Sequence, residues 1–144
     1  MPRQSMMRYL IPSLFILLCT AMSYCGKKGG STPTPPPVPA EENLVFNVDP
    51  DPGTTTAAAL GANYDFKVVI QSKMPAAGVK VDIACTRDAD NANISSRSLT
   101  GSATTVNTFV DNLQPGQLYT VKVTVTSVSK PSNTTSKTFK LARK

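Results

Sequence analysis

The chain of 144 residues contains no histidine and no tryptophan. Histidine is the usual general base near neutral pH and the commonest zinc ligand, so neither a Ser-His-Asp nor a Cys-His catalytic arrangement can be built. The acidic residues show no clustering of the kind that a hydrolytic pocket needs. We therefore expect a protein that is not an enzyme and that needs no cofactor and no metal ion.

Cysteine is scarce, with only Cys19, Cys25 and Cys85 in the chain. Cys19 lies inside an apolar leader and would be removed with it. If Cys25 carries a lipid, Cys85 has no intrachain partner and a disulfide framework is excluded. Cys85 also continues the alternation of Val81 and Ile83, so we expect a buried thiol that packs as a small hydrophobic group and does not act as a nucleophile.

Positive charge is present but is not concentrated. The formal net charge is +6, yet the lysines over residues 67–140 stand singly: Lys67, Lys73, Lys80, Lys122, Lys130, Lys137 and Lys140. Nucleic-acid binding needs basic side chains gathered along a phosphate backbone. We therefore expect the charge to serve solubility, and we expect no nucleic-acid partner.

The first residues have the layout of an export signal. Arg3 and Arg8 precede an apolar run over residues 10–22. At about 13 residues this run is shorter than the roughly 20 that a membrane-spanning helix needs, so we expect no permanent transmembrane segment. A positive flank followed by a short apolar run predicts a signal peptide, here residues 1–24, that is removed on export.

Cys25 stands directly after this leader. A basic start, a short apolar core, small residues, a cysteine and a flexible polar segment together resemble a bacterial lipoprotein signal. The resemblance implies that Cys25 becomes the N-terminus and is lipidated on its sulfur, which anchors the protein to a membrane. Tyr24 departs from the pattern, because such signals usually have a small residue directly before the cysteine. The same resemblance implies the outer membrane of the bacterial envelope, because Gly26, the residue after the cysteine, is not acidic.

An ordinary export signal is the alternative, because Ala21-Met22-Ser23 fits the small-x-small cleavage rule and would release a soluble secreted protein. The segment that follows favours the lipid anchor. Residues 25–42 form a tether rich in glycine and proline, with prolines at 33, 35, 36, 37 and 39 that favour extended polyproline II. At about 3.1 Å per residue, the tether reaches roughly 50 Å. Such a spacer has a purpose only if something is anchored.

Residues 43–144 read as strands separated by turns. Residues 63–71, 78–87 and 117–128 alternate apolar and polar side chains with a period of two, which predicts half-buried antiparallel strands. A weaker pattern begins near Leu44, and two more cover residues 105–111 and 133–141. Turn sequences such as Gln114-Pro115-Gly116 separate the strands. We therefore expect an all-β domain, a seven-stranded antiparallel β-sandwich.

The segment NLQPGQLYTVKVTV resembles the turn and sixth strand of a fibronectin type III domain, an immunoglobulin-like fold. It matches the pattern Leu-x-Pro-Gly-x-x-Tyr-x-Val-x-Val of that family at Leu113, Pro115, Gly116, Tyr119, Val121 and Val123. The resemblance implies a tyrosine corner, in which the Tyr119 hydroxyl bonds to upstream backbone. Two departures are the missing tryptophan of the second strand, whose place Tyr64 or Phe66 could take, and a long connection over residues 51–63.

Three weaker motifs have ordinary explanations. Asp88 and Asp90 have the spacing of a calcium loop, but Ala92 and Leu99 stand where further ligands are needed, so we expect a polar loop. Asn93-Ile94-Ser95 and Asn133-Thr134-Thr135 match the N-glycosylation pattern, which has no expected use in a bacterial protein. Alternation turns most aromatic side chains inward and leaves Phe109 out of phase, so the aromatic platform of a sugar-binding domain is not indicated.

These observations lead to one interpretation of function. We expect a non-enzymatic, lipid-anchored protein of the bacterial cell envelope, at the outer membrane, whose sandwich serves as a binding module or as a spacer. Its partner would be a protein or a glycan that the sequence does not identify. The alternative is a secreted soluble accessory domain that binds carbohydrate or protein.

Overall fold

The structure is a computed structural model that describes residues 40–144. The expected signal peptide, the lipidation site Cys25 and the tether up to residue 39 lie outside this range. The described part is all-β and contains no helix. Its eight strands are β1 (Phe46–Asp49), β2 (Thr56–Ala59), β3 (Tyr64–Ile70), β4 (Val79–Arg87), β5 (Asn93–Gly101), β6 (Thr105–Val110), β7 (Leu118–Ser127) and β8 (Thr134–Arg143).

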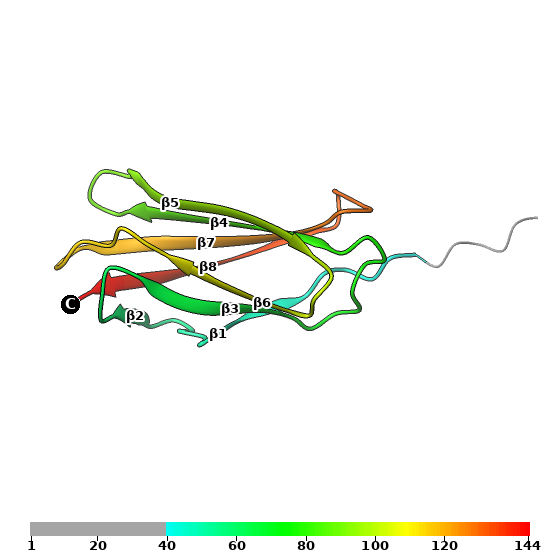
Figure 1. Ribbon diagram of the computed structural model, residues 1–144, viewed down its shortest axis with the longest axis horizontal. Coiled ribbons are helices and arrows are strands. Elements are labelled where there is room, and N and C mark those ends of the chain that lie inside the picture. The colour runs from blue at the N-terminus through cyan, green and yellow to red at the C-terminus, as the bar shows by residue number, and fades with distance from the viewer. Residues whose placement is uncertain (1–39) are drawn as a thin grey trace, which may run out of the picture. The chain divides into compact units, whose positions relative to one another are not determined.

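The strands form two layers (Figure 1). One sheet has three strands in the order β1-β3-β6, and the other has five in the order β2-β8-β7-β4-β5. Every pair is antiparallel except β2 and β8, which run parallel. The two layers make a β-sandwich, which confirms the expected all-β class. The fold differs from the expected seven antiparallel strands by one strand and by this parallel pair.

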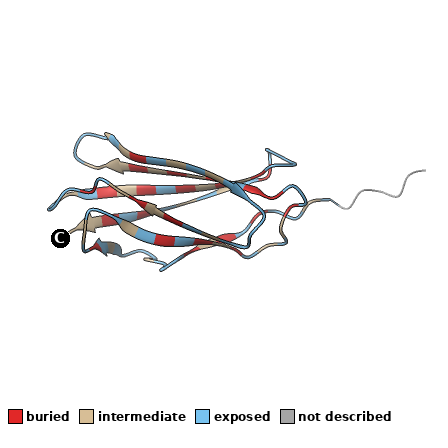
Figure 2. Cartoon of the chain, viewed as in Figure 1, coloured by how far each residue is buried: buried red, intermediate tan, exposed pale blue. Residues whose placement is uncertain are grey.

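The core lies between the two sheets, where buried residues alternate with more exposed ones along the regular strands (Figure 2). Strand β7 is the clearest example. One of its faces carries Tyr119, Val121, Val123 and Val125, which are all fully buried. A cross-sheet aromatic contact joins Phe66 of β3 to Phe139 of β8, with ring centroids 5.7 Å apart and the rings edge to face. Such aromatic pairs add about 0.5–1.5 kcal/mol beyond the area they bury.

Tyr64 and Phe66, the two residues expected in place of the missing tryptophan, both belong to this aromatic group. Their rings stack with centroids 6.2 Å apart, and the Tyr64 ring lies 6.4 Å from that of Phe139. Phe66 is buried, whereas Tyr64 is partly exposed at the end of its strand. The period-two pattern of this segment therefore identified the correct inward face.

Two strands escaped the sequence analysis. In β5 the inward positions hold Ser95 and Arg97 as well as Leu99, so the face that packs on the core is not apolar throughout. Ile94 and Leu99 are out of phase with each other, and the register against β4 shifts between Cys85 and Thr86. These features erase the alternation that identifies a half-buried strand. Strand β2 lies in the long connection over residues 51–63, and its sequence TAAA has little β-propensity.

The sandwich has two ends, which we call the entry end and the far end. The first described residues, the β3–β4 connection and the β7–β8 turn lie at the entry end (Figure 1). The C-terminal end of β8, the β4–β5 turn and the β6–β7 connection lie at the far end. Within residues 40–144, no helix is long and apolar enough to cross a membrane.

Candidate functional site

The four residues expected at the tyrosine corner come together at the far end. Leu113 and the ring of Tyr119 are fully buried, whereas Pro115 and Gly116 form the exposed turn between them. The Tyr119 hydroxyl accepts a hydrogen bond of 2.6 Å from the backbone N–H of Gln114, five residues upstream. This bond ties β7 to the connection through which the chain crosses from one sheet to the other. The Tyr119 hydroxyl is thereby bonded within the fold.

Replacing Tyr119 by phenylalanine should lower stability by about 0.5–1.5 kcal/mol, with a further cost if the Gln114 N–H loses its only partner. The ring and its burial are kept, so the change isolates the hydroxyl. Thermal unfolding of the two proteins measures the difference. A melting temperature equal to that of the wild type would show that this bond contributes nothing to stability.

Cys85 lies in the core, as its alternation predicted. It is fully buried and is a free thiol. Burial raises its pKa to about 11, and the charges of Asp111 and Asp88 act in the same direction. A thiol with so high a pKa stays protonated at neutral pH, and the thiolate is the reactive form. Cys85 therefore packs as a small apolar side chain in the core.

The acidic residues of the β4–β5 turn are engaged in ion pairs. Asp88 contacts Lys140 at 2.6 Å and Asp90 contacts Arg87 at 2.6 Å. The hydrogen bond from Arg87 is the main cause that lowers the pKa of Asp90 to about 2, helped by the backbone N–H of Ala92. Across residues 40–144, no three Asp, Glu, His or Cys side chains are placed to hold a metal ion.

The two asparagines of the N-glycosylation pattern have different surroundings. Asn93 is exposed, and its side chain bonds only to Ser96. Asn133 is buried, and its amide nitrogen donates to the Glu41 carboxylate at 2.6 Å and to the Glu42 carbonyl oxygen at 2.8 Å. The side chain of Asn133 is therefore a structural hub, which the sequence motif did not indicate.

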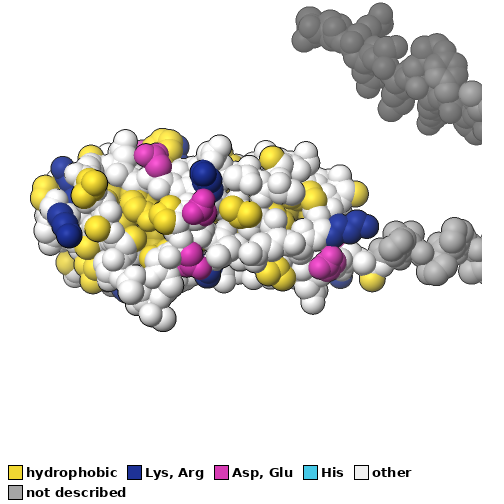
Figure 3. Space-filling view, turned by 90° about the horizontal axis from the view of Figure 1, so that it is seen from below, with side chains coloured by type: hydrophobic (Ala, Val, Ile, Leu, Met, Phe, Trp, Pro, Cys, Tyr) yellow, Lys and Arg dark blue, Asp and Glu magenta, His cyan; other side chains and the backbone are white. Residues whose placement is uncertain are grey.

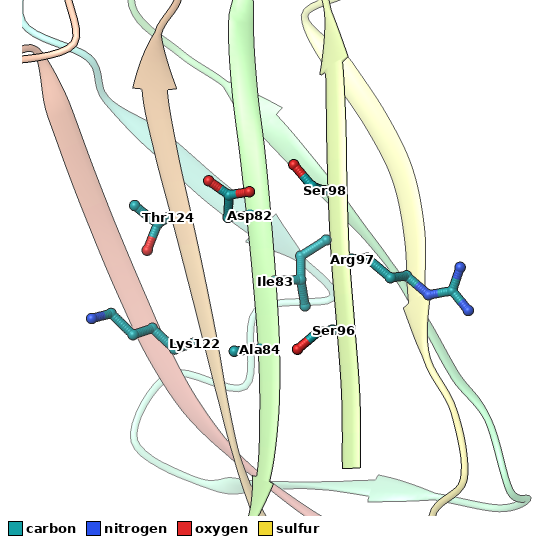
Figure 4. A pocket seen from close by; sticks show the side chains of 8 residues that line it. All are labelled: Asp82, Ile83, Ala84, Ser96, Arg97, Ser98, Lys122 and Thr124. Atoms are coloured by element: carbon teal, nitrogen blue, oxygen red, sulfur yellow. The ribbon is translucent and has the colours of Figure 1, made fainter. Parts of the chain in front are cut away.

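A shallow polar hollow lies on the outer face of the five-stranded sheet (Figure 4). Its volume is about 400 Å³, and the residues that line it are Asp82, Ile83, Ala84, Ser96, Arg97, Ser98, Lys122 and Thr124. Strand pairing explains the shape. Ala84 lies between Ser96 of β5 and Lys122 of β7, so the smallest side chain of the row forms the floor. We call this surface the polar hollow.

Of the two charged side chains on the outer face at the polar hollow, Asp82 forms an ion pair within residues 40–144 and Lys122 does not. Asp82 meets Lys80 at 3.0 Å. Burial alone would raise the pKa of Asp82, but hydrogen bonds from Ser98 and Lys80 outweigh it and lower that pKa. Lys122 makes no ion pair with any residue from 40 to 144. The hollow thus offers hydroxyl groups, one carboxylate and one available ammonium group, a set suited to hydrogen bonding with a polar ligand and equally to solvation.

One cluster at the open side of the sandwich was missed by the sequence analysis. Arg97 points away from the polar hollow (Figure 4) and reaches the Asp111 carboxylate at 2.9 Å. Its guanidinium carbon lies 3.5 Å from the centroid of the Phe109 ring. Ser95 also donates to Asp111, at 2.5 Å. The hydrogen bond from Ser95 and the pairing with Arg97 lower the pKa of Asp111.

This cluster decides what Phe109 can do. The Phe109 side chain is partly exposed, as expected from its place out of phase with the apolar residues of its strand. One face of its ring is covered by the Arg97 guanidinium, an arrangement that stabilises exposed sites by about 0.5–1 kcal/mol. That face is not available to stack on a sugar. The signal that could have revealed the cluster is Arg97 itself, a charged residue at an inward position between Ser95 and Leu99.

No protein-family model matches the chain, and no curated protein matches it at a significant level.

Proposed function

We propose that the chain is a non-enzymatic, lipid-anchored protein of the bacterial cell envelope whose β-sandwich is a binding or spacer module. The layout around Cys25 and the proline-rich tether support the anchor. The absence of histidine from the sequence and the engagement of Asp88 and Asp90 in ion pairs support a role without catalysis. Gly26 supports the outer membrane as the location.

We propose further that the sandwich is of the fibronectin type III kind. The order of β1-β3-β6 in one sheet and of β8-β7-β4-β5 in the other supports this assignment. The bond between the Tyr119 hydroxyl and Gln114 supports it as well. In this assignment β2 is an additional strand, formed where the long connection after β1 returns to the edge of the five-stranded sheet.

The observation that carries the proposal is the way the chain enters the sandwich. Glu41 accepts hydrogen bonds from Ser129 at 2.8 Å and from Asn133 at 2.6 Å. The Leu44 N–H donates to the Asn133 side-chain oxygen at 3.0 Å, and the Val45 N–H donates to Ser72 at 3.1 Å. The end of the expected tether and the first residues of the domain are thereby bonded to the β7–β8 turn and to the β3–β4 connection. The far end is therefore the end opposite the one at which the tether joins the sandwich.

The experiment that tests the anchor replaces Cys25 by serine and follows the protein by cell fractionation. We expect the wild type in the membrane fraction and Cys25→Ser in the soluble fraction, because the acyl chains that hold the protein, at about 0.8 kcal/mol per buried CH₂, are lost. Metabolic labelling with a fatty-acid analogue should mark the wild type only.

The control is Cys85→Ala, which removes the other cysteine of the mature chain and should leave both labelling and membrane retention unchanged. Unlabelled wild-type protein in the soluble, exported fraction would support cleavage after Ser23 and the secreted alternative instead. Membrane retention of Cys25→Ser in buffer without detergent would contradict the anchor.

A further inference from the structure

One edge of the five-stranded sheet is open to another strand. Strand β2 forms this edge and pairs only with β8. In a strand, the backbone N–H and C=O of one residue point to the same side and those of the next residue point to the other. The Ala59 carbonyl accepts the Lys144 N–H, so Ala57 and Ala59 face β8. The backbone groups of Thr56 and Ala58 therefore face the free side.

The side chains of this edge do not hinder pairing. Residues 53–61, GTTTAAALG, contain no charge and no proline. Natural edge strands usually carry a charged side chain, a proline, a bulge or an inward-pointing charge that prevents pairing with another chain. Strand β2 carries none of these, and its exposed side chains Thr56 and Ala58 are small.

The other three edges do carry such features. Strand β5 has the inward-pointing Arg97 and a register irregularity opposite it in β4. The same Arg97 side chain packs on Phe109 at the edge strand β6. Strand β1 ends at Asp49, which is paired with Lys67 and followed by Pro50. The edge of β2 is thus the one at which a further strand meets least obstruction.

An apolar surface adjoins this edge on the outer face. Ala58 of β2, Ala142 of β8 and Leu118 of β7 lie in one row across three neighbouring strands. Leu60, just beyond β2, is 92% exposed and Leu118 is 42% exposed. The space-filling view shows hydrophobic side chains gathered on the half of the lower face that contains β2 (Figure 3). We call Ala58, Leu60, Leu118 and Ala142 the apolar row.

The unbalanced charge beside the apolar row is positive. Lys140, in register with Thr56, contacts Asp88 at 2.6 Å, so the two charges balance each other. Lys144 bonds through its N–H to Ala59 at the other end of β2. Lys144 makes no ion pair with a residue in the range 40–144. A second copy of the chain would bring like charges together here, whereas an acidic partner would be attracted.

We propose that the edge of β2 binds an extended segment of a partner protein by strand addition, and that this segment combines apolar side chains with carboxylates. Its backbone would bond to Thr56 and Ala58, its apolar side chains would cover the apolar row, and its carboxylates would meet Lys144. The site lies at the far end, so it stays accessible on a domain held at the entry end. Binding at β2 does not need the lipid, so its test is independent of the test at Cys25.

The test uses the full chain in detergent with a labelled synthetic peptide whose alternate residues, valines followed by glutamates, share one face and are separated by threonine, so that valine and glutamate both lie on the side of the apolar row and of Lys144. A second peptide, in which lysine replaces glutamate, controls for charge. We expect the acidic peptide to bind at least about tenfold more tightly than the basic one, which corresponds to about 1.4 kcal/mol. Hydrogen exchange of residues 54–60 should slow when the acidic peptide is added, because free backbone groups become bonded.

Ala58→Pro is the informative variant. It removes the N–H on the free side and leaves the bonds between β2 and β8 in place, and proline is tolerated where the N–H faces solvent. We expect it to abolish peptide binding, whereas Ala58→Thr, which keeps the N–H, binds as the wild type does. If Ala58→Pro fails to fold, Leu60→Ser weakens binding through the apolar row without touching the strand.

Three results would overturn the proposal. The first is equal binding of the two peptides or binding of neither. The second is unchanged binding by both Ala58→Pro and Leu60→Ser, which would place the peptide elsewhere. The third is protection of residues 54–60 that grows with protein concentration in the absence of peptide, which would show that a second copy occupies the edge.

Discussion

Replacing Gly78 by alanine should destabilise the sandwich by about 2–4 kcal/mol. Gly78 has φ = 79°, in the left-handed region that side chains disfavour. A Cβ at this position would lie 2.5 Å from the carbonyl oxygen and 3.0 Å from the carbonyl carbon of Gly101. Both atoms belong to the backbone at the end of β5, so the clash cannot be relieved by the movement of a flexible side chain. Chemical denaturation should show the loss as a lower midpoint.

A matched variant separates the two costs of the Gly78 substitution, the clash with Gly101 of β5 and the backbone strain at positive φ. Gly116 has φ = 69°, but a Cβ there meets nothing within 4 Å. Gly116→Ala should therefore cost only the conformational part, about 1 kcal/mol. Equal destabilisation by the two substitutions would show that the approach of Gly101 to Gly78 costs nothing.

The second large effect is expected at Asn133. Asn133→Ala removes three hydrogen bonds, to Glu41, Glu42 and the Leu44 N–H. Leu44 is 5% exposed, so its N–H would be left without a partner in a buried place, at a cost of about 1–3 kcal/mol in addition to the bonds lost. With each bond at the low end of about 0.5 kcal/mol, we expect a total loss of at least about 2.5 kcal/mol in the free energy of unfolding.

Asn133→Ala should also release the chain at the entry end. Proteolysis near residues 40–44 should become faster in this variant while the core strands stay protected. Asn93→Ala is the control, since Asn93 belongs to the same sequence pattern but is exposed and bonds only to Ser96. It should change the free energy of unfolding by less than about 0.5 kcal/mol. Equal cleavage in the two variants would contradict a role of Asn133 in holding the chain.

The strands that the sequence predicted are those whose inward face is apolar without interruption. In β7, Tyr119, Val121, Val123 and Val125 repeat every second residue, and burial follows the same period. The first residues of β3 and β4 behave in the same way. The burial of Cys85 could be predicted for this reason, because its place in the alternation leaves it no other environment.

The polar clusters could not be predicted in this way. Arg97 and Asp111 are 14 residues apart, and Lys137 and Asp51 are 86 residues apart. Each pair joins a side chain of the five-stranded sheet to the connections of the other sheet at an open side of the sandwich. Their meeting depends on how the two layers are stacked, which no local pattern records. The polar hollow has the same origin, since Ala84 forms its floor only because of its neighbours in register.

The sequence alone determined the all-β class, the inward faces of the regular strands and the place of Tyr119, because each follows from a period of two or from a short turn motif. The tertiary structure decided the rest. Strand β2 exists because residues 56–59 find the free edge of β8, and a sequence such as TAAA becomes a strand only when a neighbour supplies hydrogen bonds. The open edge of β2 is likewise a property of pairing between segments about 84 residues apart, as in Thr56 and Lys140, and contacts between segments so distant in the chain are made only by the assembled fold.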